Sequence, residues 1–234
     1  LFYGYVTQGI VQKEDITENG IKYIKQDGSV GYYQTVNKTT PVAGDVKYVD
    51  RNGDGVVDDN DRDIIGNPNP DFTYGFQTKV SWKSLSLSAS FNGVQGRDIL
   101  NVGNRYNNTP GTKSNNVTRK AFQNMWTDEN PSNLYPKSTF VVQNMVMDRY
   151  VEDGSYLRCS DITLSYILPA KWTNKIGIKN TSVYASVKNA FVITDYSGYD
   201  PEVNSFAFDG LRPGVDMNSY PTPRSFVFGL NLTF

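Results

Sequence analysis

The sequence contains no histidine and only one cysteine, Cys159, among its 234 residues. Without histidine, the Ser-His-Asp and Cys-His arrangements of hydrolases cannot be built within this chain. One thiol excludes an internal disulfide, and there is no zinc-type Cys/His cluster. No run approaches the roughly 18 apolar residues of a membrane-spanning helix. The net charge of −1 provides no basic surface for nucleic acid.

Aromatic residues, in contrast, are abundant, with 16 Tyr and 12 Phe. The mean hydropathy of −0.49 resembles that of a water-soluble protein. A polar average does not exclude a membrane, because a transmembrane barrel strand needs apolar side chains only at alternate positions. The distribution of apolar residues is therefore more informative than their number.

The clearest pattern is a two-residue alternation from Phe72 to Trp82. Successive side chains of a strand point to opposite faces, so this segment has one apolar and one polar face. Aromatic residues near both ends of the apolar face are typical of a strand that crosses two membrane interfaces. The apolar face carries Phe72, Tyr74, Phe76, Thr78, Val80 and Trp82, and the polar face carries Thr73, Gly75, Gln77, Lys79 and Ser81.

The same alternation predicts four further strands. The strand at 84–92 forms a hairpin with 72–82 through a tight turn near Lys83. Pro169 ends the strand at 156–168, since proline cannot donate to a strand ladder. The alternation becomes less regular at the far end of the strand at 181–193. These strands are predicted at residues 84–92, 156–168, 181–193 and 226–234.

The connections between these strands alternate in length. The turn near Lys83 and the segment 169–180 are short, whereas 96–155 and 194–224 are long and polar. Short periplasmic turns that alternate with long outer loops are typical of outer-membrane barrels. We therefore predict two regions: an extracellular loop region at 1–69, and barrel strands with their loops at 70–234.

Five strands cannot close a membrane barrel, which needs at least about eight. An open sheet edge is also forbidden in lipid, because each unpaired backbone group would cost several kcal/mol. The predicted fold is thus an all-β, antiparallel transmembrane β-barrel of which this chain supplies only some strands. The chain begins at Leu1 without a visible signal peptide, so either its amino terminus was processed away or it was cut from something longer. Because the missing strands must come from elsewhere in the chain, we expect it to be part of a longer protein.

The segment 50–61 matches a calcium loop of EF-hand type. Oxygen-bearing side chains stand at positions 1, 3, 5, 9 and 12, and Gly55 at position 6 permits the sharp bend. Aspartate at position 12 is shorter than the usual glutamate. The alternative is an Asp/Asn/Gly-rich turn that binds nothing. The predicted ligands of this structural calcium ion are Asp50, Asn52, Asp54, the Val56 carbonyl, Asp58 and Asp61.

The last predicted strand resembles the carboxy-terminal signal by which outer-membrane proteins are recognised for barrel assembly. The alternative is an edge strand of a soluble sandwich, which would be an aggregation hazard if left exposed. The signal residues are Phe226, Phe228, Leu230, Leu232 and Phe234.

The remaining features of the sequence have less specific interpretations. The acid pairs Asp128/Glu129 and Glu152/Asp153 lack an identifiable catalytic partner, so we predict no enzyme activity. A short helix is expected at 117–127, and a hairpin around Glu18-Asn19-Gly20. Aromatic residues in the last long loop are candidates for stacking on a ligand, contacting a partner or packing the loops together: Tyr196, Tyr199, Phe206, Phe208 and Tyr220.

Several sequence blocks resemble the carboxy-terminal region of the SusC/RagA family, and together they span the chain. One is Gly44-Asp-Val-Lys-Tyr-Val-Asp-Arg-Asn-Gly-Asp-Gly55, followed by Asp61-Arg-Asp-Ile-Ile-Gly66-Asn-Pro-Asn-Pro70. Others are Phe2-Tyr-Gly-Tyr5, Tyr74-Gly75-Phe76, Leu164-Ser-Tyr-Ile-Leu-Pro169, Val187-Lys-Asn189, Tyr196-Ser-Gly-Tyr-Asp-Pro-Glu-Val203 and the ending Pro223-Arg-Ser-Phe-Val-Phe-Gly-Leu-Asn-Leu-Thr-Phe234.

This resemblance implies a TonB-linked transporter in the outer membrane of a Gram-negative bacterium. It implies a barrel of roughly 22 strands that encloses a plug, and a SusD-like lipoprotein as lid. Members import oligosaccharides, peptides or other large nutrients. The family's plug and TonB box precede the part present here, so the expected partners are the rest of the barrel and plug, the lid lipoprotein, TonB and membrane lipid. The alternative function is a soluble, calcium-dependent module of dockerin type.

Overall fold

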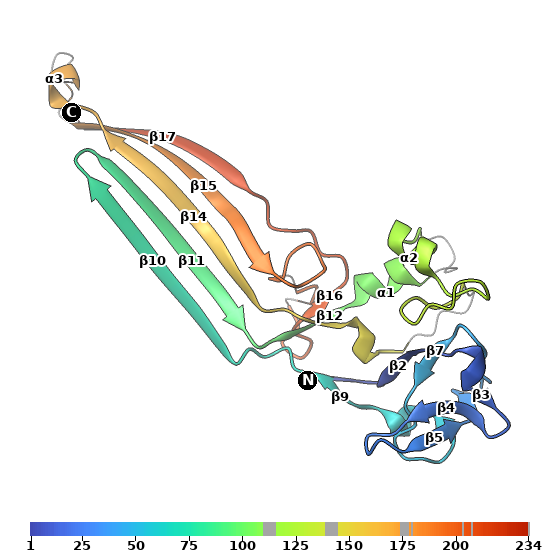
Figure 1. The fold of residues 1–234 in the computed structure, drawn as a ribbon. Coiled ribbons are helices and arrows are strands. Elements are labelled where there is room, and N and C mark those ends of the chain that lie inside the picture. The colour runs from blue at the N-terminus through green and yellow to red at the C-terminus, as the bar shows by residue number, and fades with distance from the viewer. Residues whose placement is uncertain are drawn as a thin grey trace. The chain divides into compact units, whose positions relative to one another are not determined.

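Two units make up the fold of the computed structural model, which describes residues 1–109, 116–138, 145–173, 178, 180–202, 204–206 and 208–233 (Figure 1). The first unit contains residues 1–69, 98–152 and 204–219. The second contains residues 70–97, 153–203 and 220–234. Segments distant in sequence therefore contribute to each unit.

A five-stranded antiparallel sheet forms the second unit, in the order β10-β11-β14-β15-β17. All five predicted strands are present. The short helix α3 (Ala170–Thr173) lies in the connection between β14 and β15. The strands are β10 (Phe72–Trp82), β11 (Leu85–Gln95), β14 (Tyr156–Ile167), β15 (Asn180–Thr194) and β17 (Ser225–Thr233).

The register aligns residues of like polarity across the sheet. Because directly opposed residues of antiparallel strands share a face, each row can be followed from one edge to the other. One row is apolar and consists of Val80, Leu87, Leu164, Ala185 and Phe228. The adjacent row on the other face is mostly polar and consists of Lys79, Ser88, Thr163, Ser186 and Val227.

The register of β14 shifts between Cys159 and Asp161. Such a bulge inserts a residue that the neighbouring strands do not match, so the sheet bends locally. Cys159 lies opposite both Phe91 and Phe191, and its side chain is fully buried. The two phenyl rings make an edge contact at 6.3 Å between centroids. The free thiol therefore serves as a small packing residue between larger aromatic neighbours.

The first unit consists of short strands in several small sheets. Their orders are β1-β9, β2-β7, β3-β4-β5, β6-β8 and β13-β12-β16. The strands are β1 (Phe2–Gly4), β2 (Thr7–Ile10), β3 (Ile16–Thr17), β4 (Gly20–Ile24), β5 (Val30–Tyr33), β6 (Thr35–Val36), β7 (Val46–Tyr48), β8 (Val56–Val57), β9 (Asp63–Gly66), β12 (Asp98–Asn101), β13 (Val151–Asp153) and β16 (Val215–Asp216).

Helices in this unit are short. The expected helix is found as α2 (Arg119–Asn124), where the Thr118 side chain accepts a hydrogen bond from the Ala121 amide and so caps the first turn. The expected hairpin is also found, with Thr17 opposite Gly20. The others are α1 (Val102–Asn108) and the 3₁₀ turns Lys13–Asp15, Asp59–Asp61 and Asp148–Tyr150.

Buried tyrosines hold these small sheets together. Tyr23, Tyr33 and Tyr48 are almost completely buried in one cluster with aliphatic side chains and Met147. The Tyr23 hydroxyl donates to the Asp50 carbonyl at 2.7 Å, which ties β4 to the start of the acidic segment 50–61. In the part of the chain that the structure describes, no helix has the length and apolar character needed to cross a membrane.

Candidate functional site

The apolar face of the five-stranded sheet is largely uncovered. Phe76, Val80 and Trp82 of β10 are 52%, 64% and 68% exposed. On the other strands Leu87, Leu164 and Phe228 are 47%, 45% and 78% exposed. The rings of Phe76 and Phe91 stack at 4.6 Å between centroids, so the face is continuous across strands. An apolar surface of this extent on a sheet marks contact with another apolar phase or partner.

The opposite face is lined by small polar side chains that hydrogen-bond to one another. The Ser81 and Ser86 hydroxyls lie 2.8 Å apart across the hairpin. The Asp161 carboxylate accepts hydrogen bonds from the hydroxyls of Thr163 at 2.8 Å and Ser186 at 2.7 Å. This face can therefore contact water or other polar groups.

The final strand β17 continues the apolar face. Phe226, Phe228, Leu230 and Leu232 lie opposite Val187, Ala185, Val183 and Thr181 of β15, and all four are exposed. Phe234, the last residue of the predicted assembly signal, lies outside the described residues. The arrangement suits the predicted signal, whose recognition stays a prediction.

The acidic segment 50–61 folds around two buried carboxylates. Asp50 accepts hydrogen bonds from the amides of Gly53 at 2.6 Å and Gly55 at 2.8 Å, one on each oxygen. Gly55 has φ of +86°, a conformation that favours glycine and permits the bend predicted for position 6. Each Asp50 oxygen keeps a second acceptor position.

Asp61 has a different role in this loop. Its carboxylate, fully buried, accepts hydrogen bonds from the amides of Arg51 at 2.7 Å, Asn52 at 3.3 Å and Asp58 at 2.8 Å. A carboxylate offers about four acceptor positions. A bidentate contact from Asp61 to a metal would therefore require at least one of these bonds to break.

The loop carries a strong excess of negative charge. Its twelve residues hold five aspartates and one arginine, and Arg51 pairs with Asp63 outside the loop. Burial raises the pKa of Asp50, and the nearby charges of Asp61 and Asp54 act in the same direction, against the amide bonds from Gly55 and Gly53. The donor types and the charge suit a hard dication.

The side-chain positions do not by themselves form a metal centre. Among the residues that the structure describes, no group of three or more Asp, Glu, Cys or His side chains is arranged to hold a metal ion. Asp54 and Asp58 instead accept hydrogen bonds from the amides of Val56 and Asn60. A bound calcium ion would thus require these two side chains to turn towards Asp50.

The segment after the loop bears on the dockerin alternative. A dockerin-type module has a helix after each of two calcium loops. Here the loop ends in a single 3₁₀ turn, Asp59–Asp61, and continues into strand β9. Neither this local structure nor the single loop in the sequence favours that alternative.

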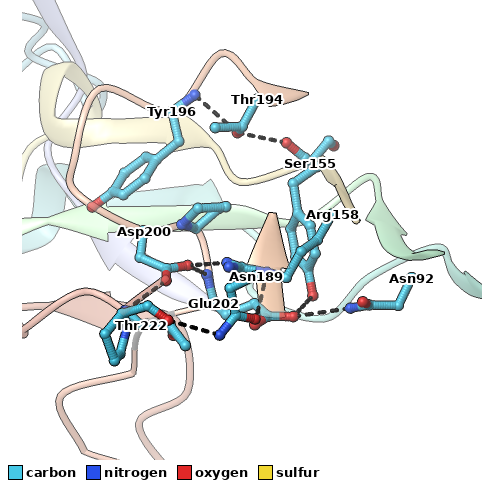
Figure 2. A network of polar contacts seen from close by, with 12 residues as sticks. Asn92, Ser155, Arg158, Asn189, Thr194, Tyr196, Asp200, Glu202 and Thr222 are labelled. Carbon is cyan, nitrogen blue, oxygen red and sulfur yellow. Dashed lines mark hydrogen bonds and ion pairs between the residues drawn. The ribbon is translucent and has the colours of Figure 1, made fainter. Parts of the chain in front are cut away.

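A buried charge cluster lies beside the polar face, at the end of the sheet where β14 begins and β15 ends (Figure 2). Arg158 of β14 lies opposite Asn92 of β11, so the register places it on the polar face. Its guanidinium forms ion pairs with Asp200 at 2.5 Å and Glu202 at 3.2 Å. Glu202 also accepts hydrogen bonds from Tyr156 and Asn92.

Asp200 is held in its charged form. Burial opposes ionisation, but amide bonds from Glu202 and Thr222 and the charge of Arg158 hold the pKa of Asp200 below its ordinary value. The side chains of Arg158 and Asp200 are only 6% and 4% exposed. This cluster therefore clamps the loop after β15 onto the polar face of the sheet.

Sequence patterns did not reveal this clamp. Arg158 and Asp200 are 42 positions apart, and strict alternation would put Arg158 on the apolar face with Ile162 and Leu164. The bulge between Cys159 and Asp161 moves it to the polar face. The available signal was an arginine at an apolar position of the predicted alternation, together with the acidic pair Asp200-Pro201-Glu202 in a later loop.

The predicted loop aromatics do not behave as one set. Tyr196 is buried and packs within the loop, whereas Tyr199 and Tyr220 are 75% and 88% exposed. Phe208 is fully exposed, and the Phe206 ring lies 4.1 Å from the Arg212 guanidinium. The exposed members stay candidates for ligand or partner contacts.

Comparison with known proteins places these features in one family. The chain is 35% identical over 201 residues to TonB-dependent receptor P26 of Formosa agariphila, a match that covers 82% of this chain and 20% of that receptor. It is 34% identical over 194 residues to TonB-dependent receptor SusC of Bacteroides thetaiotaomicron, covering 80% of this chain and 17% of SusC. No family model matches the chain.

A solved structure of the RagAB peptide importer, in its open-open state, is similar along the whole chain. The TM-score is 0.68 at 25% identity, and the match covers 22% of the RagAB chain. The chain thus spans between 17% and 25% of the length of the curated relatives it matches. On these similarities, the chain belongs to the SusC/RagA family of TonB-dependent receptors.

Proposed function

We propose that this chain forms part of the wall and outer vestibule of an outer-membrane importer of large nutrients. The observation that carries the proposal is the five-stranded sheet, which has one exposed apolar face and one face of small polar groups. In a membrane barrel the first face meets lipid and the second meets the lumen. The family membership supports the same function.

The sheet requires further strands to work in this way. β10 and β17 are its two edges, and each leaves a row of backbone groups without a neighbouring strand in the sheet. Such edges are not tolerated in hydrocarbon. The rest of the receptor supplies the missing strands and the plug, giving a closed barrel of roughly 22 strands.

Two relatives support the cargo and partners that we propose for the whole receptor. SusC is named as a TonB-dependent receptor, and RagAB is described as a peptide importer. The whole receptor takes up oligosaccharides, peptides or similar nutrients, with a SusD-like lipoprotein as lid and TonB as the source of energy. The chain has no catalytic role. Its exposed loop aromatics, such as Tyr199 and Tyr220, face the cargo or the lid.

Nutrient depletion tests this proposal. A strain that lacks the receptor gene should fail to deplete at least one class of compound from a medium that contains mixed peptides and oligosaccharides. It should still consume free amino acids and monosaccharides. Mass spectrometry of the spent medium provides the measurement, and restoring the gene is the control. Unchanged depletion of every peptide and oligosaccharide would contradict an importer of large nutrients.

We also propose that the loop 50–61 binds calcium as a structural ion. Asp50, Asn52, Asp54, Asp58 and the Val56 carbonyl would hold it, with Asp61 supporting the loop through its amide bonds. The bound ion would neutralise the excess charge of the loop and keep it ordered at the outer surface. The support is the net negative charge and the unused acceptor positions of Asp50.

Calcium should protect this loop in the full-length receptor, and Asp50→Asn should remove the protection. At a concentration of about 100 times the dissociation constant, calcium stabilises its folded site by about 2.7 kcal/mol. Limited proteolysis around residues 50–61, with calcium or with a chelator, gives the measurement.

Glu14→Gln is the matched control, because it removes an exposed carboxylate in the 3₁₀ turn Lys13–Asp15, outside the loop. It should leave the calcium effect intact. Identical cleavage with calcium and with chelator in the unmodified receptor would refute the site.

A further inference from the structure

One end of the five-stranded sheet carries basic residues without acidic ones, whereas the other end carries charges of both signs. The short connections at one end carry Lys83, between β10 and β11, and Lys171, in α3 (Figure 1). The segments 72–97, 162–194 and 225–234 contain no acidic residue. At the other end, aspartates lie just outside three strand ends, Asp71 before β10, Asp153 before β14 and Asp195 after β15. Two arginines lie at that end as well, Arg97 after β11 and Arg224 before β17.

Each of the two lysines has an exposed tryptophan beside it. Trp82 is 68% exposed and Trp172 is 59% exposed. The Lys83 ammonium lies 4.8 Å from the centre of the Trp82 ring. Exposed tryptophans are otherwise an uncommon feature of a protein surface, and at strand ends of a barrel they occupy the level of the lipid headgroups.

Neither lysine is neutralised by a residue that the structure describes. Among the described residues, no ion pair involves Lys83 or Lys171. Trp82 lies opposite Leu85, at the end of the apolar face, so Lys83 stands where hydrocarbon gives way to headgroups. A flexible cation beside an interfacial indole is suited to a phosphate at that depth.

We infer that this end of the sheet binds anionic phospholipids through Lys83 and Lys171, with Trp82 and Trp172 seated among the headgroups. The inference rests on the proposed barrel, in which the short connections face the periplasm. The ligand is therefore a phosphate headgroup of the inner leaflet, such as phosphatidylglycerol, and zwitterionic headgroups bind less well.

Lipid retention by the full-length receptor tests the inference. The receptor is reconstituted in nanodiscs of equimolar phosphatidylglycerol and phosphatidylcholine, extracted in mild detergent, and its retained lipids are counted by native mass spectrometry. Phosphatidylglycerol should be enriched on the unmodified receptor. The double variant Lys83→Gln/Lys171→Gln should lose about fivefold in preference for each lysine removed.

Lys79→Gln is the matched control. The substitution removes the same charge three positions from Trp82, and Lys79 lies on the polar face, opposite Ser88. It should keep the enrichment of the unmodified receptor. Equal retention of the two lipids by the unmodified receptor, or undiminished enrichment in the double variant, would overturn the inference while leaving the barrel intact. A receptor that enters no nanodisc of any composition would instead overturn the proposed function.

Discussion

Arginine in place of Leu87 should strongly reduce assembly of the full-length receptor in the outer membrane, whereas arginine in place of Ser88 should be tolerated better. Leu87 lies in the apolar row between Val80 and Leu164, and its side chain is 47% exposed. A lipid-facing arginine costs about 2–4 kcal/mol at the midplane and less towards the interfaces. Leu87 is the third residue of β11, so we expect about 2 kcal/mol.

Ser88 is the control position, because a substitution there tests the other face of the strand at nearly the same depth in the membrane. Ser88 is the next residue and lies in the polar row, opposite Lys79 and Thr163. Repulsion between an arginine there and Lys79 costs about 0.2–1 kcal/mol, which is smaller than the lipid penalty. Assembly is measured as the heat-modifiable band of the folded barrel in outer-membrane fractions. Equal losses for the two variants would contradict the assigned faces.

Arg158→Met should release the loop that follows β15. The change leaves the buried carboxylate of Asp200 without its cation, and removing one partner of a buried ion pair costs about 3–5 kcal/mol. Glu202, which lies 3.2 Å from the Arg158 Nε atom, loses its partner at the same time. Hydrogen exchange of residues 196–202 in the full-length receptor should rise by orders of magnitude.

The double variant Arg158→Met/Asp200→Asn is the control for this prediction. It removes both charges of the 2.5 Å pair, so no uncompensated carboxylate stays at position 200. Its exchange should lie between those of the single variant and the unmodified receptor. Undisturbed exchange in Arg158→Met would show that the ion pairs do not hold the loop in place.

The sheet could be predicted from sequence because its strands are long and follow a local rule. Alternation, with Pro169 as the end signal of β14, defined β10 and β14 to within a residue of their observed ends. The irregular end predicted for the strand near 193 has a physical cause. β15 passes the bulge of β14 there, and Asn189 adopts a φ of +52°.

The first unit could not be predicted in the same way. Its strands are two to five residues long, too short for a periodic pattern. They are fixed by contacts between distant segments, such as Tyr48 with Met147, 99 positions apart. The clamp of Arg158 and Asp200 depends on a similar long-range approach. The acidic loop 50–61 could be predicted only in part. Its motif predicted the bend at Gly55, but not that Asp61 accepts hydrogen bonds from backbone amides.

Spin-label accessibility along β11 tests the central claim most directly. Single cysteines at positions 85–91 of the full-length receptor, with Cys159 replaced by alanine, are labelled with a nitroxide after reconstitution in bilayers. Collisions with oxygen, which concentrates in hydrocarbon, should peak at every second label, and collisions with a water-soluble nickel chelate should be low at those labels. Oxygen maxima are expected at Leu85, Leu87, Ala89 and Phe91, and minima at Ser86, Ser88 and Ser90. Uniform accessibility, or maxima at the serines, would contradict a sheet that separates lipid from an aqueous lumen.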